Sequence, residues 1–319
     1  MRAVQITSLD GPQAVDVHDV PDPVPGDDQV LIRVKAAGVA FPEVLQSRGL
    51  YQLKPDLPFV PGAEVAGEVV SAPSGSGLSE GDRVCALPLL GGLAELTVAH
   101  HSTVFRLPDD VSFEAGAALP FNYLTSYFAL VERGRMAEGE TVLVHGAAGG
   151  IGTSAIQVAK AFGAGRVVAV TSTAEKGAVA LDAGADEFVL ADGFLDAVKE
   201  SGKVDIVVDP VGGDRFTDSL RTLKDDGRLL VIGFTAGQIP EVKVNRLLLN
   251  NISVVGVGWG AYAMKRPGHF AEEWAAIEPH VASGALTPPI GATFSMEQVT
   301  DALLTIDERR ATGKVLLVP

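Results

Sequence analysis

The feature that most constrains this chain is a regular alternation of apolar strands and helical segments in its second half. Val142-Leu143-Val144 and Ile206-Val207-Val208 are apolar without a break, which indicates burial on both faces, as in parallel strands. Strands are expected at 141–145, 166–170, 187–190, 204–209, 227–233 and 252–259, with helices at 152–162, 174–183, 193–200 and 214–223. This alternation predicts an α/β fold built on a doubly wound parallel sheet.

The regions on either side of this alternation follow a different pattern. Residues up to about 110 form short β-rich runs separated by Pro, Gly and Asp clusters. A helical stretch over 114–132 leads into the alternation, and the C-terminal region has helices near 270–283 and 296–309 and a closing strand at 314–318. We expect this tail to return to the N-terminal body. One β-rich domain would then comprise 1–118 and 262–319, and the parallel-sheet domain would comprise 119–261.

The first strand of the predicted sheet runs into a glycine-rich turn. After Thr141–His145 the chain reads Gly146-Ala-Ala-Gly149-Gly150-Ile151-Gly152 and then becomes helical. Gly149 would let the backbone approach a pyrophosphate, Gly152 would allow close helix–strand packing, and the helix N-terminus supplies N–H groups and partial positive charge. Ala147 replaces the first glycine of the usual Gly-x-Gly-x-x-Gly spacing. A tight turn that needs small residues only for packing is therefore the alternative, but its strand–turn–helix context favours a dinucleotide site.

The residues after the second strand favour NADPH over NADH. An NAD site carries a carboxylate about 20 residues beyond the turn, at the end of the second strand. Here that strand ends Val170-Thr171-Ser172-Thr173-Ala174-Glu175-Lys176, with no acid at its tip. Hydroxyls at 171–173 and the Lys176 ammonium suit a 2′-phosphate, which an aspartate would repel. The alternative is an ordinary solvated helix start, with a capping hydroxyl and a surface lysine.

Charge and cysteine content limit the function classes. The chain has 25 Lys and Arg against 40 Asp and Glu, and its net charge of −15 disfavours nucleic-acid and anionic-membrane partners. A single cysteine, Cys85, excludes an internal disulfide framework and a multi-cysteine zinc site. Apolar runs fall short of the roughly 20 residues that a membrane span needs, and no secretory signal follows Met1. We expect a cytoplasmic protein.

Several ordered motifs resemble those of one family. The segment Val144–Gly152 resembles the cofactor turn of zinc-free quinone oxidoreductases, the zeta-crystallin-like group within the medium-chain dehydrogenase/reductase superfamily. Further matching stretches are Leu57–Gly67, Gly81–Val84, Ala117–Thr125, Val207–Gly213, Gly227–Phe234 and Arg310–Pro319. The resemblance covers essentially the whole chain. It implies a GroES-like β-rich catalytic domain, completed by the C-terminal segment, together with a Rossmann domain.

The sequence also bears on zinc. Zinc-dependent relatives carry a Cys and a Gly-His-Glu ligand set, whereas the matching stretch here reads Pro61-Gly62-Ala63-Glu64. Alanine stands where the histidine would be, Cys85 lies inside a predicted strand, and Glu64 alone cannot hold a tetrahedral ion. No metal site is predicted, and zinc-assisted alcohol oxidation is disfavoured.

The resemblance implies an NADPH site residue by residue. It places Gly149, Gly150 and Ile151 at the pyrophosphate, and Ser172 and Lys176 at the 2′-phosphate. The other implied contacts are Thr125 near the nicotinamide, Phe234, Val257, Gly258 and Trp259 around the nicotinamide and its ribose, and Arg310 near the phosphates. The alternatives are ordinary core packing for the two aromatic residues and a surface ion pair for Arg310.

Tyr51 is the candidate on the acceptor side. The resemblance matches it to a tyrosine that lines the nicotinamide and substrate cleft. Its hydroxyl is the expected donor to a developing oxyanion, with solvent delivering the proton. An exposed loop aromatic is the alternative. Ala40 stands where relatives often have Asn, so the choice of substrate does not transfer.

Three functional hypotheses follow. The first is hydride transfer from NADPH to a quinone or similar conjugated acceptor, without metal or flavin. The second is reduction of the double bond of α,β-unsaturated carbonyls or acyl thioesters, and the third is a non-catalytic NADPH-sensing binding protein. The hydrophobic segment 252–259 is expected at one edge of the sheet, and the resemblance implies a homodimer through it.

Overall fold

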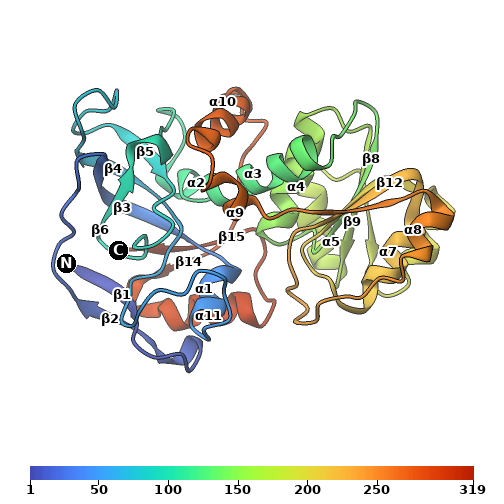
Figure 1. Cartoon of the computed structure of the whole chain (residues 1–319), viewed down its shortest axis with the longest axis horizontal. Helices are drawn as coiled ribbons and strands as arrows, with labels where there is room; N and C mark the ends of the chain where they lie inside the picture. Colours follow the sequence, from blue (N-terminus) through green and yellow to red (C-terminus); the bar gives the residue numbers. More distant parts are fainter. The chain divides into compact units, whose positions relative to one another are not determined.

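The computed structural model describes all residues from 1 to 319. Its internal contacts divide the chain into two compact units (Figure 1). Unit 1 comprises Met1–Phe121, Pro267–Ala276 and Pro288–Pro319, and unit 2 comprises Asn122–Arg266 and Ile277–Thr287. None of the helices combines the length and the apolar composition needed to cross a bilayer.

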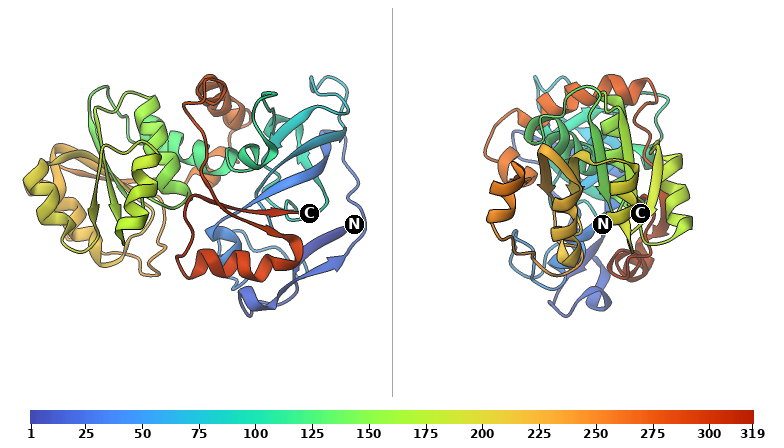
Figure 2. Two further views of the ribbon diagram at one scale, coloured as in Figure 1. Left: turned by 180° about the vertical axis from the view of Figure 1, so that it is seen from behind. Right: turned by 90° about the vertical axis from the view of Figure 1, so that its right-hand side faces the viewer.

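Unit 2 contains a six-stranded parallel sheet in the order β10-β9-β8-β11-β12-β13. The strands are β8 (Thr141–His145), β9 (Arg166–Thr171), β10 (Glu187–Leu190), β11 (Val204–Asp209), β12 (Leu223–Val231) and β13 (Ser253–Gly256). The chain moves outward from β8 to β10, then from β11 to β13 in the opposite direction. This order fits helices on both faces of the sheet, as Figure 2 shows. The predicted doubly wound sheet is confirmed.

The helices of unit 2 cover this sheet in two groups. Helices α4 (Gly150–Ala161) and α5 (Ala174–Asp182) contact each other and the strands β8 to β10. Helices α6 (Phe194–Ser201) and α7 (Phe216–Thr222) also contact each other, with β10 and β12 beneath them. Two further short helices are α8 (Asn245–Asn250) and α9 (Trp259–Ala263). Because helices cover both faces, Val142, Val144, Ile206 and Val208 are fully buried.

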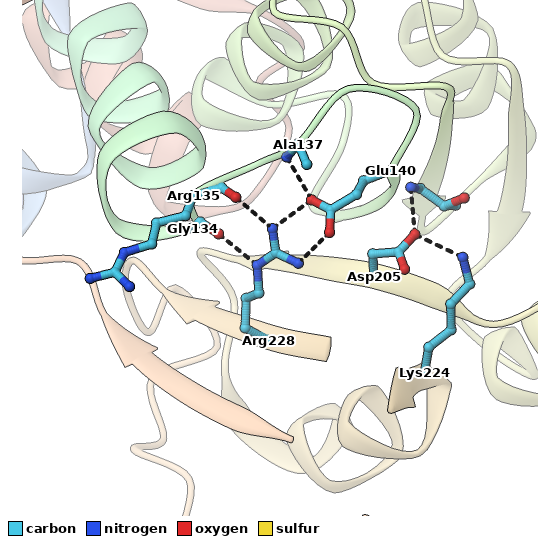
Figure 3. Close-up of polar contacts among 8 residues, drawn as sticks. Gly134, Arg135, Ala137, Glu140, Asp205, Lys224 and Arg228 are labelled. Atoms are coloured by element: carbon cyan, nitrogen blue, oxygen red, sulfur yellow. Dashed lines mark hydrogen bonds and ion pairs between the residues drawn. The ribbon is translucent and has the colours of Figure 1, made fainter. Parts of the chain in front are cut away.

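Arg228 on β12 ties the start of this sheet to the preceding turn (Figure 3). Its guanidinium donates to both carboxylate oxygens of Glu140, at 2.7 and 2.5 Å, and to the carbonyls of Gly134 and Arg135. Burial would raise the pKa of Glu140, but hydrogen bonds from Arg228 and from the Ala137 N–H outweigh it and lower that pKa. These bonds hold β12 to the segment that enters β8.

A second ion pair lies beside the first. Asp205 accepts from Lys224 and from the N–H of Thr141, both at 2.8 Å (Figure 3). The amino ends of β8 and β11 are therefore held together, at the edge of the sheet away from the glycine-rich turn.

Unit 1 is built on a mixed seven-stranded sheet in the order β14-β15-β3-β4-β5-β7, with β6 also paired to β3. Its strands are β3 (Gln29–Val39), β4 (Glu64–Ser71), β5 (Arg83–Ala86), β6 (Leu96–His100), β7 (Val104–Arg106), β14 (Ile290–Ser295) and β15 (Lys314–Val318). A separate antiparallel ribbon is formed by β1 (Arg2–Ile6) and β2 (Val15–Asp19). The closing strand β15 runs antiparallel to β3, so the C-terminal end lies in the N-terminal sheet.

Few helices accompany this sheet. They are α1 (Phe41–Gln46), α2 (Phe113–Gly116) and α11 (Val299–Asp307), and α11 packs on α1, β2, β14 and β15 (Figure 2). Helices α3 (Pro120–Tyr127) and α10 (His269–Ala282) each begin in unit 1 and end in unit 2. Residues 277–287 cluster with unit 2, where Gln157 Nε2 donates to the carbonyl of Thr287 at 2.8 Å.

Three predicted elements have different bounds in the structure. The helical stretch over 114–132 is divided into α2, α3 and a wider helical segment at Phe128–Arg133, because Pro120 starts a new helix and lacks the N–H to continue the first. The strand expected at 227–233 is β12, which starts at Leu223 and ends at Val231. The segment 252–259 forms a strand only over Ser253–Gly256, and Trp259 already begins α9.

Candidate functional site

The cofactor residues predicted in unit 2 gather at the carboxyl ends of its strands. Gly149, Gly150 and Ile151 follow β8, Ser172 follows β9, and Val257 follows β13. Phe234 lies three residues beyond β12. Because all six strands are parallel, these loops share one edge of the sheet, which is where open α/β sheets bind their ligands.

The glycine-rich turn presents the start of α4 at this edge. Gly149 is the N-cap of α4, its N–H donates to the carbonyl of Gly146 at 2.9 Å, and its carbonyl accepts from Thr153 N–H at 2.8 Å. The first turn of α4 carries no acidic side chain. A Cβ at position 149 would meet only the Gly146 carbonyl oxygen, at 3.4 Å. The backbone here is therefore open to a close-lying anion, and the free N–H groups of the helix favour one.

Gly152 has a different task from Gly149. A Cβ at Gly152 would collide with the Gly146 carbonyl oxygen and with the backbone of Ala147. The close packing expected at this glycine is confirmed, since only a residue without a side chain lets α4 begin directly against the turn.

His145, the last residue of β8, adds no positive charge to this edge. Burial lowers its pKa to about 4, and its ring Nε2 lies 2.8 Å from Ser219 Oγ. The ring packs edge-on against Phe194. His145 is therefore a neutral core residue at pH 7.

Of the three hydroxyl side chains at the end of β9 and after it, two make local hydrogen bonds and one is exposed. Thr171 is buried and donates to the carbonyl of Thr173, while Thr173 Oγ1 accepts from the N–H of Lys176 as the N-cap of α5. Ser172 is exposed and Lys176 is half-buried. Of the three hydroxyls predicted to suit a 2′-phosphate, those of Thr171 and Thr173 serve the fold, which leaves Ser172 and Lys176 as the candidates.

The loops after β11 and β12 support one another. Asp209 Oδ1 accepts from the N–H groups of Val211 and Gly212, both at 2.9 Å, and the Val211 carbonyl accepts from Ala236 N–H. A Cβ at Gly212 would lie 2.9 Å from the ring of Phe234. Gly212 thus gives room to the half-buried Phe234, which is held at the carboxyl edge rather than in the core.

The remaining predicted residues of unit 2 differ in exposure. Val257 and Trp259 are buried, Gly258 between them is exposed, and Thr125 on α3 is buried. Next to Thr125, Ser126 Oγ lies 2.7 Å from Ser154 Oγ, which joins α3 to α4. Arg310 belongs to unit 1, where its exposed side chain pairs with Glu308 at 2.7 Å.

In unit 1 a buried charged cluster forms where three strands meet. Because β3 is antiparallel to both β4 and β15, its carboxyl end lies beside Glu64, the first residue of β4, and Lys314, the first residue of β15. Lys314 Nζ donates to Glu64 Oε1, and the N–H of Phe121 donates to Oε2 at 2.9 Å. A Cβ at Gly38 would collide with the Glu64 side chain, so this glycine makes room for the pair. Both oxygens of Glu64 are thus engaged within the protein.

Glu43 and Tyr51 complete this region. Glu43, in the first turn of α1, is 2% exposed, and its Oε2 accepts from the Ala40 N–H at 2.9 Å. Burial raises the pKa of Glu43 to about 7, against the attraction of Lys314. Tyr51 is half-buried, and burial, followed by the charge of Glu43, raises the pKa of its hydroxyl. Tyr51 therefore has a buried carboxyl as its electrostatic neighbour.

The sequence did not single out Glu43, Lys314 or Asp209. Pro42-Glu43 resembles a solvated helix start, and Lys314 opens a strand at the end of the chain. Only contacts between distant strands place these charges together. Asp209 could have been found, because an Asp at the end of an apolar strand followed by Pro-Val-Gly-Gly is typical of a side chain that caps its own loop.

Known proteins share this architecture. Residues 26–109 match the alcohol dehydrogenase GroES-like domain, and residues 150–278 match the zinc-binding dehydrogenase family. The chain is 39% identical to quinone oxidoreductase-like protein 2 of Mus musculus over 322 residues, covering 99% of this chain and 91% of that protein.

Two solved structures extend the comparison. A probable oxidoreductase from Mycobacterium abscessus is 43% identical, with a TM-score of 0.91 over 100% of this chain and 99% of that one. The quinone oxidoreductase from Thermus thermophilus, described together with its NADPH complex, is 34% identical, with a TM-score of 0.88 over 100% of both chains.

A GroES-like sheet combined with a Rossmann sheet defines the medium-chain dehydrogenase/reductase superfamily. Within that superfamily, the chain belongs to the quinone oxidoreductase family. The resemblance and the fold class expected from the sequence are both confirmed.

The two glycines of the turn should respond differently to substitution. Gly152→Ala should lower the free energy of unfolding by about 2–3 kcal/mol, because the added Cβ forces the turn backbone to move. Gly149→Ala should change it by less than about 1 kcal/mol, because its Cβ fits. Urea denaturation of both variants measures the difference, and equal losses would contradict the assignment.

Proposed function

We propose that this chain is an NADPH-dependent oxidoreductase that reduces a quinone or a similar conjugated acceptor without a metal ion. The observation that carries the proposal is the open backbone of Gly149 at the N-terminus of α4, on the carboxyl edge of a parallel sheet. The NADPH complex of the Thermus relative, which has the same fold, supports the choice of cofactor.

The proposed cofactor site divides among the strand ends. Gly149, Gly150 and Ile151 would face the pyrophosphate: the Gly149 N–H is bound to the Gly146 carbonyl, so the N–H groups of Gly150 and Ile151 would donate to it. Ser172 and Lys176 would bind the 2′-phosphate. Phe234, Val257, Gly258 and Trp259 would surround the nicotinamide ribose, with Thr125 near the ring and Arg310 toward the phosphates. We propose that the domain predicted at 119–261 binds the cofactor and that the domain predicted at 1–118 and 262–319 is catalytic, with residues 277–287 of the latter clustering with unit 2.

On the acceptor side we assign the chemistry to Tyr51. A bound NADPH would supply a hydride, which is two electrons and one proton, and would be oxidised to NADP⁺. The Tyr51 hydroxyl would donate a hydrogen bond to the acceptor oxygen on which negative charge develops, and solvent would supply the second proton. Glu64 stands at the position of a zinc ligand in zinc-dependent relatives. Here its two oxygens accept from Lys314 and from the Phe121 N–H instead.

Two alternatives use the same cofactor site. Reduction of the double bond of an unsaturated carbonyl or acyl thioester needs the same hydride and the same oxyanion donor. A protein that binds NADPH only as a sensor would need neither. Tyr51 is half-buried and its pKa is raised by burial and by the charge of Glu43. Shifted pKa values are typical of catalytic sites, and a protein that only binds NADPH does not need one, so this favours a catalytic role.

The acceptor class can be tested directly. We expect the purified chain, with NADPH, to reduce 1,4-naphthoquinone faster than conjugated aldehydes, ketones or acyl thioesters at equal concentration. Loss of NADPH absorbance measures each rate. Faster reduction of the conjugated aldehydes, ketones or acyl thioesters would show that these, and not quinones, are the acceptors. Binding of NADPH without turnover on any acceptor would favour the sensor.

Cofactor choice should depend on Lys176. Lys176→Ala should raise the Kd for NADPH about tenfold, since one charge-assisted bond to a phosphate is lost, and leave that for NADH nearly unchanged. Lys199→Ala, which removes a lysine from α6 instead, is the matched control. Fluorescence titration measures both constants. Equal affinities for the two cofactors in the unsubstituted protein would refute the assignment.

We further propose a homodimer formed through the edge strand β13, in a cytoplasmic protein. Within the predicted segment 252–259, residues Ser253–Gly256 form β13 at the edge of the sheet, where one side of a strand has no neighbouring strand to pair with. Beside it, Val244, Leu248 and Leu249 of the α8 region are 72%, 76% and 74% exposed, which is unusual for apolar side chains on a monomer surface. The single buried cysteine, Cys85, fits a reducing compartment.

The dimer proposal predicts an effect of charge on α8. Leu248→Glu should convert a dimer of the chain into a monomer at micromolar concentration, because it places a charge inside an apolar interface. Leu181→Glu on α5, where the leucine is 40% exposed, should leave the mass unchanged. Sedimentation velocity measures both, and a monomeric unsubstituted protein would contradict the proposal.

A further inference from the structure

The charged cluster of unit 1 contains one more acid than base. Lys314 and Glu64 form an ion pair with 3% and 1% of their side chains exposed, so together they carry no net charge. Glu43 is the second buried carboxyl beside the same ammonium. If Glu43 ionises, two buried carboxylates share one cation, and the excess negative charge has little solvent to screen it.

The turn after α1 fixes the position of Tyr51, whose pKa responds to the charge of Glu43. Helix α1 ends at Gln46, and the N–H of Leu50 donates to the carbonyl of Leu45 at 2.9 Å, which turns the chain immediately before Tyr51. Gly49 permits the turn with a φ of 65°. The Arg48 guanidinium binds both oxygens of Asp307 on α11, at 2.8 and 2.6 Å, and anchors this segment. Glu43 and Tyr51 are therefore held in a fixed relation by one short helix and its turn.

We propose that Glu43 is a positioning residue that acts through Tyr51: while its carboxyl is neutral, the Tyr51 hydroxyl donates fully to the acceptor, and when it ionises, its negative charge weakens that donation and slows reduction. This inference rests on the proposed function, in which Tyr51 donates to the acceptor oxygen. The electrostatics support it: burial is the larger cause of the raised pKa of Tyr51, and the negative charge of Glu43 raises that pKa further, which makes the phenol a weaker donor.

The other charged groups near Glu43 do not cancel this effect. Lys314 from β15 favours its ionisation, and Glu64 from β4 opposes it. Helix α11, which packs on α1, brings Asp307, whose carboxylate is bound by Arg48 at the opposite end of α1, and the exposed Asp301. Burial outweighs the attraction of Lys314 and sets the pKa of Glu43 at about 7. The two protonation states are therefore both populated at neutral pH.

Reduction of the acceptor requires no proton from Glu43. The hydride adds to the acceptor with both electrons, and the resulting anion takes one proton from solvent. The Tyr51 hydroxyl stabilises the negative charge before that proton arrives, and its O–H bond stays intact. Glu43 changes only how readily this hydroxyl is shared, so its ionisation should lower kcat and leave the KM for NADPH unchanged.

The test compares pH profiles of kcat with NADPH and 1,4-naphthoquinone. The unsubstituted protein should lose on the order of tenfold in kcat between pH 6 and pH 8. Glu43→Gln should keep the low-pH rate across this range, because the amide oxygen can still accept from the Ala40 N–H but cannot ionise. Glu43→Asp should retain a decline, and Tyr51→Phe should be slow with a flat profile. Glu68→Gln, which removes a half-exposed carboxylate from the neighbouring part of β4, should behave like the unsubstituted protein.

A second readout needs no activity. Between about pH 4.5 and 7, Glu43 is ionised in the unfolded chain and protonated in the folded one, so stability falls as pH rises and levels off above pH 7. The Tm of Glu43→Gln minus that of the unsubstituted protein should therefore increase from pH 5 to pH 7. A constant difference in Tm, or a Gln variant whose kcat declines as steeply as that of the unsubstituted protein, would overturn the inference alone. Absence of reduction with every acceptor at every pH would overturn the proposed function and this inference with it.

Discussion

The organisation of the cofactor-side unit depends on one constraint: parallel strands covered by helices on both faces must all end at the same edge. Val142, Val144, Ile206 and Val208 are buried between two helical layers. Because the strands are parallel, the loops that follow them all lie at the carboxyl edge of the sheet. The glycine-rich turn then needs only Gly152, which lets α4 start against the strand, to present a helix N-terminus at that edge. The Arg228–Glu140 and Lys224–Asp205 pairs lie at the other edge of the sheet, opposite the edge at which the cofactor site is proposed.

In the β-rich unit the corresponding constraint is a buried ion pair at the end of β3. Its antiparallel neighbours β4 and β15 both begin there, and their first residues, Glu64 and Lys314, are buried as an ion pair. An ion pair removed from water is stable only when its remaining lone pairs are satisfied, and the Phe121 N–H does this for Glu64. Burial raises the pKa of the neighbouring Glu43 to about 7, against the attraction of the same ammonium. Of the two buried carboxyls, Glu64 is therefore paired, while Glu43 populates both protonation states near pH 7 and its charge acts on the tyrosine assigned to the acceptor.

Short-range contacts show how several of the predicted residues are used in the fold. Thr171, Ser172 and Thr173 look equivalent in the sequence, yet only Ser172 is both exposed and outside the local hydrogen bonds that start α5. Trp259 was placed in a strand because its neighbours are apolar, but Gly256 and Gly258 end that strand and the tryptophan opens a helix. Arg310 was assigned to cofactor phosphates, and its side chain pairs with Glu308.

By itself, the sequence determined the α/β class, the parallel sheet, the position of the glycine-rich turn and the family, because apolar periodicity and turn glycines are local signals that act within a few residues. Only the tertiary structure decided which polar side chains serve function and which serve the fold. Glu43, Glu64 and Lys314 are separated by up to 271 positions and become one charged cluster only when β3, β4 and β15 pair. Charge burial and its effect on protonation arise from that pairing, and no local pattern in the sequence contains them.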